Sequence, residues 1–342
     1  MIKYHKILIT GTSGFLGGRL SKHLKTSFPD IEIVCTSRSD QKKDDLINHG
    51  CTFVQGDLND PAFTNDLLTG VDAIVHCAAL SAPWGKKEDF YMANTLLTSN
   101  LLAAALKKGI KRFIYISSPS IYFNFKDRFN VSENDPLPLK IVNEYAFSKL
   151  ETEKIVHSYN QKGFNTVSIR PRAIIGAEDS VIFPRIIRAY LNNKLRIIGN
   201  GQNIADLTCV TNVIQAIICA LNAPADVMGM AYNISNGEPV NLWDEINYVL
   251  SELNYPPVKK KVPYPIIWTI VWLSETLHKL RKKESEPVLT LYGIGTLAKS
   301  LTMDISLAKK NLGYAPVQAT REGITEFLNW YKMNNKATHS KI

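Results

Sequence analysis

The chain has 342 residues, enough for two lobes of roughly 150 residues each. Apolar residues make up 45% and charged residues 21%, which excludes a disordered chain and a disulfide-stapled scaffold. The net charge of +9 is spread thinly and accompanies no nucleic-acid recognition motif, so we expect an anionic small ligand or surface and no nucleic acid.

Residue types that mark a compartment or a metal are sparse. The five cysteines are scattered without a Cys-x-x-Cys pair, which favours a reduced, cytoplasmic compartment. The seven histidines lack metal-ligand spacing, so no metal site is expected. The segment Met1-Ile2-Lys3 leads almost at once into a short strand, unlike a signal peptide. No run reaches the ~20 apolar residues of a membrane span.

Short apolar segments alternate with amphipathic stretches through the first half of the chain. This rhythm predicts a parallel sheet covered on both faces, and right-handed crossovers make it a doubly wound α/β fold. The predicted strands are residues 5–10, 31–36, 52–55, 72–76, 112–116 and 166–169. The predicted helices are residues 15–26, 42–49, 61–68, 88–108 and 143–161.

The first strand runs into a glycine-rich turn that opens the first helix. Gly11 permits a tight turn, Gly14 lets backbone approach a pyrophosphate, and a glycine at 17 lets helix and strand pack closely. The positive end of the helix then favours the anion. A glycine triplet between a strand and a helix indicates a Rossmann fold. The residues expected to hold the pyrophosphate are Gly11, Ser13, Gly14, Phe15 and Leu16.

The end of the second strand distinguishes two cofactors. An acidic residue there binds the ribose 2′-hydroxyl of NAD, whereas an arginine accepts the 2′-phosphate of NADP. This chain has Ser37 and Arg38 at that point, with Lys42 and Lys43 shortly after. The sequence therefore favours NADP, bound by Arg38 with help from Ser37. NAD stays open if the strand extends as far as Asp40.

Four Tyr-xxx-Lys matches occur, so position must distinguish them. Three are in loops, contain prolines or precede a glycine turn: Tyr122–Lys126, Tyr190–Lys194 and Tyr255–Lys259. The fourth pair, Tyr145 and Lys149, begins a long helix and shares one helix face. A free tyrosine has a pKa of about 10, and a neighbouring ammonium stabilises its phenolate. Such a pair, with a serine that orients the substrate oxygen, suits hydride transfer between a nicotinamide and a carbinol or ketone.

After Arg170 the apolar runs become shorter and glycine and proline interrupt them. We predict a dinucleotide-binding domain at residues 1–170, to which residues 205–235 return. A smaller substrate lobe is expected from residues 171–204 and 236–331, followed by a frayed polar tail at 332–342.

Residues 265–283 form an unusually apolar helix that ends in Lys279, Arg281, Lys282 and Lys283. Such a helix is a buried core helix, the cover of an apolar site, or an interfacial helix with peripheral membrane contact. Trp84 follows the fourth strand and either lines the substrate mouth or anchors a loop. Both features favour a small hydrophobic substrate.

Several segments resemble motifs of the extended short-chain dehydrogenase/reductase superfamily, of the NAD-dependent epimerase/dehydratase type. They span nearly the whole chain. Besides the glycine turn they are Gly56-Asp57-Leu58, Val75-His76-Cys77-Ala78-Ala79, Ile116-Ser117-Ser118-Pro119-Ser120-Ile121-Tyr122, Tyr145-Ala146-Phe147-Ser148-Lys149, Arg170-Pro171 and Asn311-Leu312-Gly313-Tyr314-Ala315-Pro316.

The resemblance implies roles for individual residues. Ser118 occupies the catalytic serine position and holds the substrate oxygen, Tyr145 is the general acid/base, and Lys149 lowers the tyrosine pKa and holds the nicotinamide ribose. The further cofactor contacts that it implies are Asp57 and Leu58 at the adenine, Ala78 and Ala79 beside the cofactor, and Pro171 at the nicotinamide.

Within the superfamily the chain is similar to 3β-hydroxysteroid dehydrogenases, sterol-4-carboxylate 3-dehydrogenases and 2-alkyl-3-oxoalkanoate reductases. The similarity rests on Ala82-Pro83-Trp84-Gly85, Val210-Thr211-Asn212-Val213 and residues 262–289. It implies an oxidoreductase of lipid metabolism that acts at a 3-hydroxy or 3-oxo position, and with Arg38 at the end of the second strand we expect it to prefer NADP(H). The wider resemblance to the superfamily implies a homodimer. A nucleotide-sugar epimerase or dehydratase with bound NAD is the main alternative, and a non-catalytic cofactor-sensing protein is a third.

Overall fold

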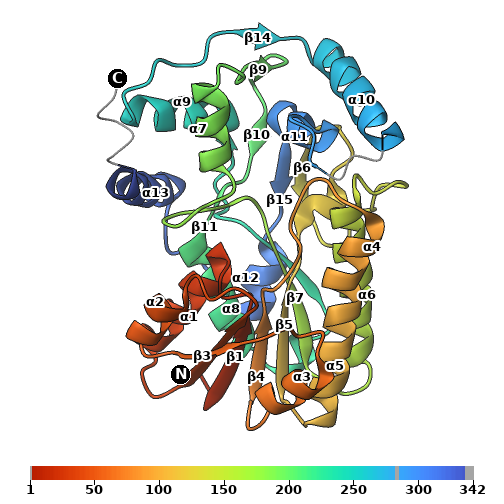
Figure 1. Cartoon of the computed structure of the whole chain (residues 1–342), viewed down its shortest axis with the longest axis vertical. Coiled ribbons are helices and arrows are strands. Elements are labelled where there is room, and N and C mark those ends of the chain that lie inside the picture. Colours follow the sequence, from red (N-terminus) through yellow and green to blue (C-terminus); the bar gives the residue numbers. More distant parts are fainter. Residues whose placement is uncertain (1, 282–284, 336–342) are drawn as a thin grey trace.

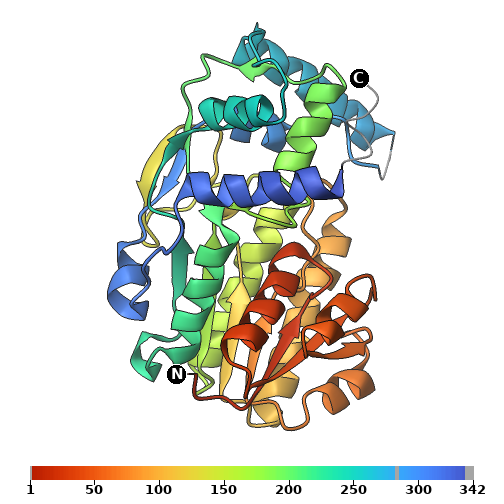
Figure 2. The same ribbon diagram turned by 90° about the vertical axis from the view of Figure 1, so that its left-hand side faces the viewer.

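The computed structural model describes residues 2–281 and 285–335. A helix-flanked sheet near the N-terminus forms one lobe, and a smaller lobe lies beyond one end of that sheet (Figure 1). Figure 2 shows helix α13 (Thr320–Asn334) lying crosswise between the two.

Seven parallel strands form the main sheet in the order β12-β7-β5-β4-β1-β2-β3, which confirms the doubly wound α/β fold. Six of them were predicted to within two residues at each end. The seventh was missed because Asn233 interrupts its short apolar run; the Asn233 amide binds the Val131 carbonyl at 3.0 Å. The strands are β1 (Lys6–Thr10), β2 (Glu32–Ser37), β3 (Thr52–Gln55), β4 (Ala73–His76), β5 (Arg112–Ile116), β7 (Thr166–Pro171) and β12 (Ala231–Ile234).

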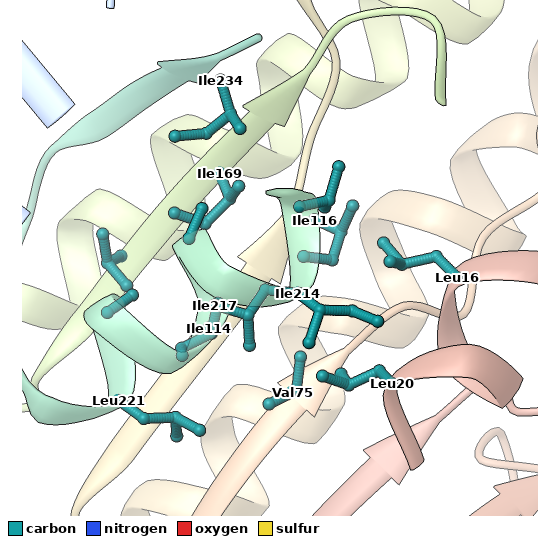
Figure 3. Close-up of a cluster of buried hydrophobic side chains, with 14 of the residues drawn as sticks. Leu16, Leu20, Val75, Ile114, Ile116, Ile169, Ile214, Ile217, Leu221 and Ile234 are labelled. Carbon is teal, nitrogen blue, oxygen red and sulfur yellow. The ribbon is translucent and has the colours of Figure 1, made fainter. Parts of the chain in front are cut away.

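Helices cover both faces of this sheet because its strands bury side chains on alternate sides. One face packs on α1 (Phe15–Ser27), α2 (Lys43–Asn48) and α8 (Val210–Asn222). Figure 3 shows Leu20 of α1 and Ile214 of α8 beside Val75 of β4. The other face packs on α3 (Pro61–Leu67), α5 (Leu97–Lys107) and α6 (Glu144–Asn160).

The helix predicted at residues 88–108 is three consecutive segments. A short helix, α4 (Lys87–Phe90), passes into a π-helix at Tyr91–Leu96 and then into α5. The wider π turn contains Asn94, whose side chain bonds to both backbone groups of Leu80 and to the Ser148 hydroxyl. The helix is therefore wider at the point where Asn94 holds the backbone of Leu80, in the segment after β4.

The smaller lobe has a four-stranded sheet in the order β13-β10-β15-β6 and two strand pairs, β8 with β11 and β9 with β14. Strand β6 lies early in the sequence, so the chain enters this lobe before completing the main sheet. The bounds are β6 (Arg128–Val131), β8 (Ile174–Ile175), β9 (Ile197–Ile198), β10 (Ile204–Ala205), β11 (Thr208–Cys209), β13 (Val240–Asn241), β14 (Lys261–Val262) and β15 (Leu301–Met303).

The helices of this lobe surround a second core that contains Trp243 and Phe327. They are α7 (Phe183–Leu191), α9 (Leu242–Glu252), α10 (Tyr264–Leu280), α11 (Leu291–Ala298), α12 (Ser306–Leu312) and α13. Because α13 continues through Asn334, the start of the predicted frayed tail at 332 is wrong, and residues 336–342 lie outside the described part.

The apolar helix α10 lies on the outer rim of the smaller lobe (Figure 1). Val271 is its one fully buried residue, so its interpretation as an internal core helix is wrong. The basic run that follows is described only as far as Arg281. Among the described helices, none combines the length and the hydropathy needed to cross a bilayer.

Glycine turns connect helices to strands at the amino edge of the main sheet. Gly70, Gly109 and Gly163 precede β4, β5 and β7, with φ angles of +72°, +70° and +85°. A Cβ at any of the three would meet no atom within 4 Å. The residues singled out for chemistry lie instead at or beyond the carboxyl edge, as expected for a doubly wound sheet.

Candidate active site

The turn after β1 packs so closely on the end of β4 that it requires glycine. Gly11 has a φ angle of +70°, and a Cβ there would lie 2.6 Å from the backbone nitrogen of Ala78. A Cβ on Gly17 would lie 2.6 Å from the Gly11 carbonyl oxygen, so α1 begins in contact with the turn. Side chains at either position would displace backbone.

The N-terminus of α1 has the form of an anion site. Gly14 is its N-cap, and within the described residues no side chain caps the helix and no acidic residue occupies its first turn. The first N–H groups of the helix, beginning at Phe15 and Leu16, have no carbonyl acceptor within the helix, because no helical turn precedes them. They and the positive end of this 13-residue helix fit a pyrophosphate.

The end of β2 presents one exposed cation. The buried Ser37 hydroxyl donates to the Ser39 carbonyl at 2.5 Å and folds the backbone around Arg38. The Arg38 guanidinium makes no hydrogen bond or ion pair with any residue that the structure describes. Because β2 ends at Ser37, Asp40 lies beyond the strand tip. The residues present therefore fit a 2′-phosphate.

Two further cations lie beside the glycine turn and share one carboxylate. Lys42 Nζ is 3.3 Å from the Gly14 carbonyl oxygen and 2.6 Å from Glu178, which also binds Lys22 at 2.6 Å. Burial alone would raise the pKa of Glu178, but the two lysines hold it below its ordinary value. Sequence reasoning missed Glu178 because it lies in the smaller lobe, far along the chain.

The remaining predicted cofactor contacts lie near the same edge. The Asp57 carboxylate accepts the Asn59 N–H at 2.9 Å, while the Leu58 side chain is packed in the core. The Ala78 N–H donates to the Thr10 hydroxyl at 3.2 Å, with Ala79 next in the chain. Pro171 is the last residue of β7. Their contacts with a cofactor stay predictions.

His76 at the end of β4 joins three elements while fully buried. Its ring nitrogens lie 2.8 Å from the Thr10 hydroxyl and 3.0 Å from the Thr98 hydroxyl. Burial lowers the pKa of His76 to about 3, with a smaller contribution from the nearby Lys149. The ring is therefore neutral at physiological pH.

This buried ring predicts acid sensitivity. The unfolded chain binds a proton at His76 below pH 6.5, whereas the folded chain does so only near pH 3. The folded state therefore loses stability relative to the unfolded state as the pH falls from 6.5 toward 3. The free energy of unfolding should fall by up to about 1.4 kcal/mol per pH unit for this group. Urea unfolding at several pH values should give a shallower slope for His76→Asn; equal slopes in the variant and the wild type would contradict this account.

The predicted catalytic residues come together at the carboxyl edge of β5. Asn143 caps α6 by accepting the Ala146 N–H at 2.8 Å, which sets the first turn containing Tyr145. Lys149, one turn later, is buried; its Nζ donates to the Ile116 carbonyl at 2.8 Å and lies 5.9 Å from the centroid of the Tyr145 ring. Ser118 follows the same strand, β5.

The pKa values in this group have distinct causes. Burial raises the pKa of Tyr145, and hydrogen bonds with Ser81 and Ser118 partly offset that effect. Burial lowers the pKa of Lys149 to about 8, so it still carries its charge at neutral pH. The pKa of Tyr145 thus shifts opposite to the expected direction, because the burial cost of the phenolate exceeds the effect of its neighbours.

Ser81 is a site residue that the sequence did not reveal. It lies just beyond Ala78-Ala79, and Asn94 positions the segment by accepting the Leu80 N–H at 2.7 Å. The same Asn94 side chain donates to Ser148 Oγ at 2.9 Å on α6. This places the Ser81 loop and the Tyr145 helix in one hydrogen-bonded unit. In the sequence, only its position just after the predicted fourth strand pointed to Ser81.

Aromatic side chains from both lobes lie beside the catalytic group. The Phe90 and Tyr145 ring centroids are 6.4 Å apart. Phe123, just beyond Tyr122, makes an edge contact with Tyr292 of α11 at 5.7 Å. The predicted substrate residue Trp84 lies against α10, with its ring 6.3 Å from that of His278 and 5.5 Å from Lys279 Nζ. Tyr292 of the smaller lobe also contributes to the raised pKa of Tyr145, so this lobe lies close to the catalytic group.

A separate cavity of about 270 Å³ lies between α6 and the strands β7 and β12. Glu153 and Arg170 line it and form a buried ion pair at 2.5 Å. Ser118, Tyr145 and Lys149 do not line this cavity. It is therefore distinct from the catalytic group.

Comparisons with known proteins identify a family and similar proteins for this chain. A sequence profile of the NAD dependent epimerase/dehydratase family matches residues 7–235. A 2-alkyl-3-oxoalkanoate reductase of Shewanella oneidensis is 29% identical, over 94% of this chain and 85% of that protein. A decarboxylating sterol-4-alpha-carboxylate 3-dehydrogenase of Mus musculus is also 29% identical, over 94% and 90%. The solved UDP-glucuronic acid 4-epimerase of Bacillus cereus, in complex with NAD, has a TM-score of 0.75 at 24% identity, over 96% of this chain and 99% of that one.

Proposed function

Because the chain belongs to the NAD dependent epimerase/dehydratase family of enzymes, we propose that it is an oxidoreductase that interconverts a secondary alcohol and a ketone. Its substrate is hydrophobic and lipid- or steroid-like, it reacts at a 3-hydroxy or 3-oxo position, and the preferred cofactor is NADP(H). The observation that carries this proposal is the meeting of Ser118, Tyr145 and Lys149 beside aromatic side chains of both lobes.

The residues of the chain divide the work of such a reaction. Bound nicotinamide cofactor supplies or accepts the hydride. The Ser118 hydroxyl orients the substrate oxygen, and the Tyr145 hydroxyl donates a proton to that oxygen in reduction and removes it in oxidation. Lys149, held by the Ile116 carbonyl, supplies a positive charge beside the tyrosine and binds the nicotinamide ribose. The N-terminus of α1 binds the pyrophosphate and Arg38 the 2′-phosphate.

The substrates named for the two relatives share a chemical feature. A 3-oxoalkanoate has its ketone β to a carboxylate, and a sterol-4-carboxylate has its 3-oxygen in the same relation. In this chain Arg172 follows β7 directly, and β7 pairs with β5, the strand that ends two residues before Ser118. Its Nε is buried without a partner among the described residues. Arg172 also opposes the effect of burial on the pKa of both Tyr292 and Asp206. We assign the substrate carboxylate to Arg172.

This assignment predicts a selective loss of affinity. For Arg172→Gln we expect KM for a 3-oxo acid to rise by ~10- to 100-fold, the equivalent of one charged hydrogen-bonded contact. KM for the corresponding neutral ketone should stay constant. Exposed Arg185, 3.5 Å from Glu286, is the matched control, and Arg185→Gln should leave both values unchanged. Equal effects of Arg172→Gln on acid and ketone would reject the assignment while leaving the activity itself established.

The activity is tested directly with purified protein. NADPH absorbance should fall when long-chain 3-oxo acids or 3-oxo steroids are added, and a reduced 3-hydroxy product should accumulate. Protein that retains NAD through purification, and that converts UDP-sugars but no 3-oxo compound, would instead be the epimerase alternative. Binding of the nicotinamide cofactor without turnover of any of these compounds would favour the non-catalytic, cofactor-sensing alternative.

A further inference from the structure

Helix α10 presents two opposite apolar faces, of which only one is packed. The inner face includes Trp268 and Val271 and contacts α11. The outer face has five residues spaced four, three, four and three apart, which aligns them along ~21 Å of helix. These side chains and their exposed fractions are Ile266 56%, Ile270 56%, Leu273 50%, Leu277 48% and Leu280 74%. We refer to these five residues as the outer stripe.

The exposed charges directly before α10 and at its C-terminal end are basic. Lys259, Lys260 and Lys261 are exposed before the helix, and Lys279 and Arg281 are exposed at its end. The acidic residue of α10, Glu275, accepts the Leu291 N–H at 2.6 Å and is thereby tied to the neighbouring α11 segment. The outer stripe therefore lies between two exposed groups of cations.

We propose that the outer stripe of α10 docks on a lipid surface that contains anionic headgroups. Apolar side chains enter the acyl boundary while lysine and arginine bind the headgroups, which is the pattern of an interfacial helix. The exposed Trp272 on the flank of the stripe suits the same boundary. A second copy of the chain fits less well, because antiparallel pairing of two α10 helices would bring cations at one end against cations at the other.

The inner face of α10 connects this surface to the catalytic group. Trp268 makes an edge contact with Phe125 at 4.7 Å, and Phe125 contacts Phe123 at 5.3 Å. Near its other end, α10 contacts Trp84 through His278. An apolar substrate would thus pass from the bilayer under α10 toward Tyr145; this passage rests on the proposed function, whereas docking itself does not.

The test uses the full chain, without substrate or cofactor, and sedimentation with vesicles. One set is phosphatidylcholine alone and the other contains phosphatidylglycerol as well. We expect binding to the anionic vesicles and weak binding to the neutral ones. Ile270→Glu with Leu277→Glu should reduce the partition coefficient at least ~10-fold, and each of Lys259→Gln and Lys279→Gln about 5-fold. Exposed Val317, on another surface, supplies the control Val317→Glu, which should bind as wild type does.

The outcomes separate the occupants of the stripe. Melting curves first establish that each variant is folded, and size-exclusion chromatography with light scattering gives its mass. Failure of folded wild type to bind anionic vesicles overturns the proposal. So does a double variant that binds vesicles normally but changes from dimer to monomer, since the stripe is then a contact between copies. Because the vesicle assay measures no turnover, its outcome stays valid even if the proposed enzymatic function is wrong.

Discussion

Replacing Tyr145 with phenylalanine should lower kcat by ~10³-fold and leave the dissociation constant of NADPH within about twofold of wild type. The substitution removes the hydroxyl whose pKa Ser81 and Ser118 lower, but it keeps the ring beside Phe90. The substrate oxygen then loses its proton donor, while the pyrophosphate and 2′-phosphate sites are untouched. NADPH oxidation and a fluorescence titration measure the two quantities separately.

A second Tyr-xxx-Lys match in the chain supplies the control. The Tyr190 hydroxyl donates to the Pro256 carbonyl at 2.9 Å in the smaller lobe, remote from Ser118 in the fold. Tyr190→Phe should therefore keep the kcat of wild type. A Tyr145→Phe enzyme with more than a tenth of normal kcat would remove Tyr145 from the acid/base role. Loss of NADPH binding in a folded variant would equally contradict the division of roles.

The second large effect concerns cofactor choice. Wild type should bind NADPH more tightly than NADH, and Arg38→Gln should weaken NADPH binding by ~10- to 100-fold without changing NADH. Arg38 is exposed and unpaired among the described residues, so its whole hydrogen-bonding capacity is available to a 2′-phosphate. Titration of nicotinamide fluorescence in both proteins measures all four constants.

Neighbouring Lys43 is the matched control for this change of charge. It is exposed at the start of α2, and Lys43→Gln should alter either affinity by less than ~3-fold. Lys42 is a poorer control, because Glu178 and the Gly14 carbonyl already engage its ammonium group. Tighter binding of NADH than NADPH by wild type would exclude Arg38 as the selector.

Local patterns predicted the main sheet well, and non-local pairing explains what they missed. The strands at 52–55 and 112–116 have the predicted bounds, because continuous apolar runs between turns leave little choice. Strand β12 is short and contains the polar Asn233, whose burial makes sense only beside Tyr122 and Val131. The π-helix at Tyr91–Leu96 likewise depends on contacts of Asn94 with residues far from it in sequence.

The candidate site divides in the same way. Gly11 lies in a glycine-rich turn between a strand and a helix, and Tyr145 and Lys149 are four residues apart on one helix. Such local spacings determine the relative positions of these residues, so the sequence was sufficient to select them. Glu178 and Ser81 have no such pattern, since each acquires its partners only when distant segments fold together. The composition of α10 alone did not distinguish a core helix from a surface helix, because a helix with apolar residues on both faces has the same kind of sequence in both environments.

The glycine turns before β4, β5 and β7 make one edge of the protein a convenient place to attach reporters. Gly70, Gly109 and Gly163 face open space, and the catalytic group lies at the opposite ends of these strands. A change there alters the left-handed backbone preference, at a cost of ~1–2 kcal/mol for most residues, but contacts no ligand. A dye coupled at Gly109→Cys would therefore monitor unfolding without disturbing chemistry, so stability and turnover can be followed independently in one molecule.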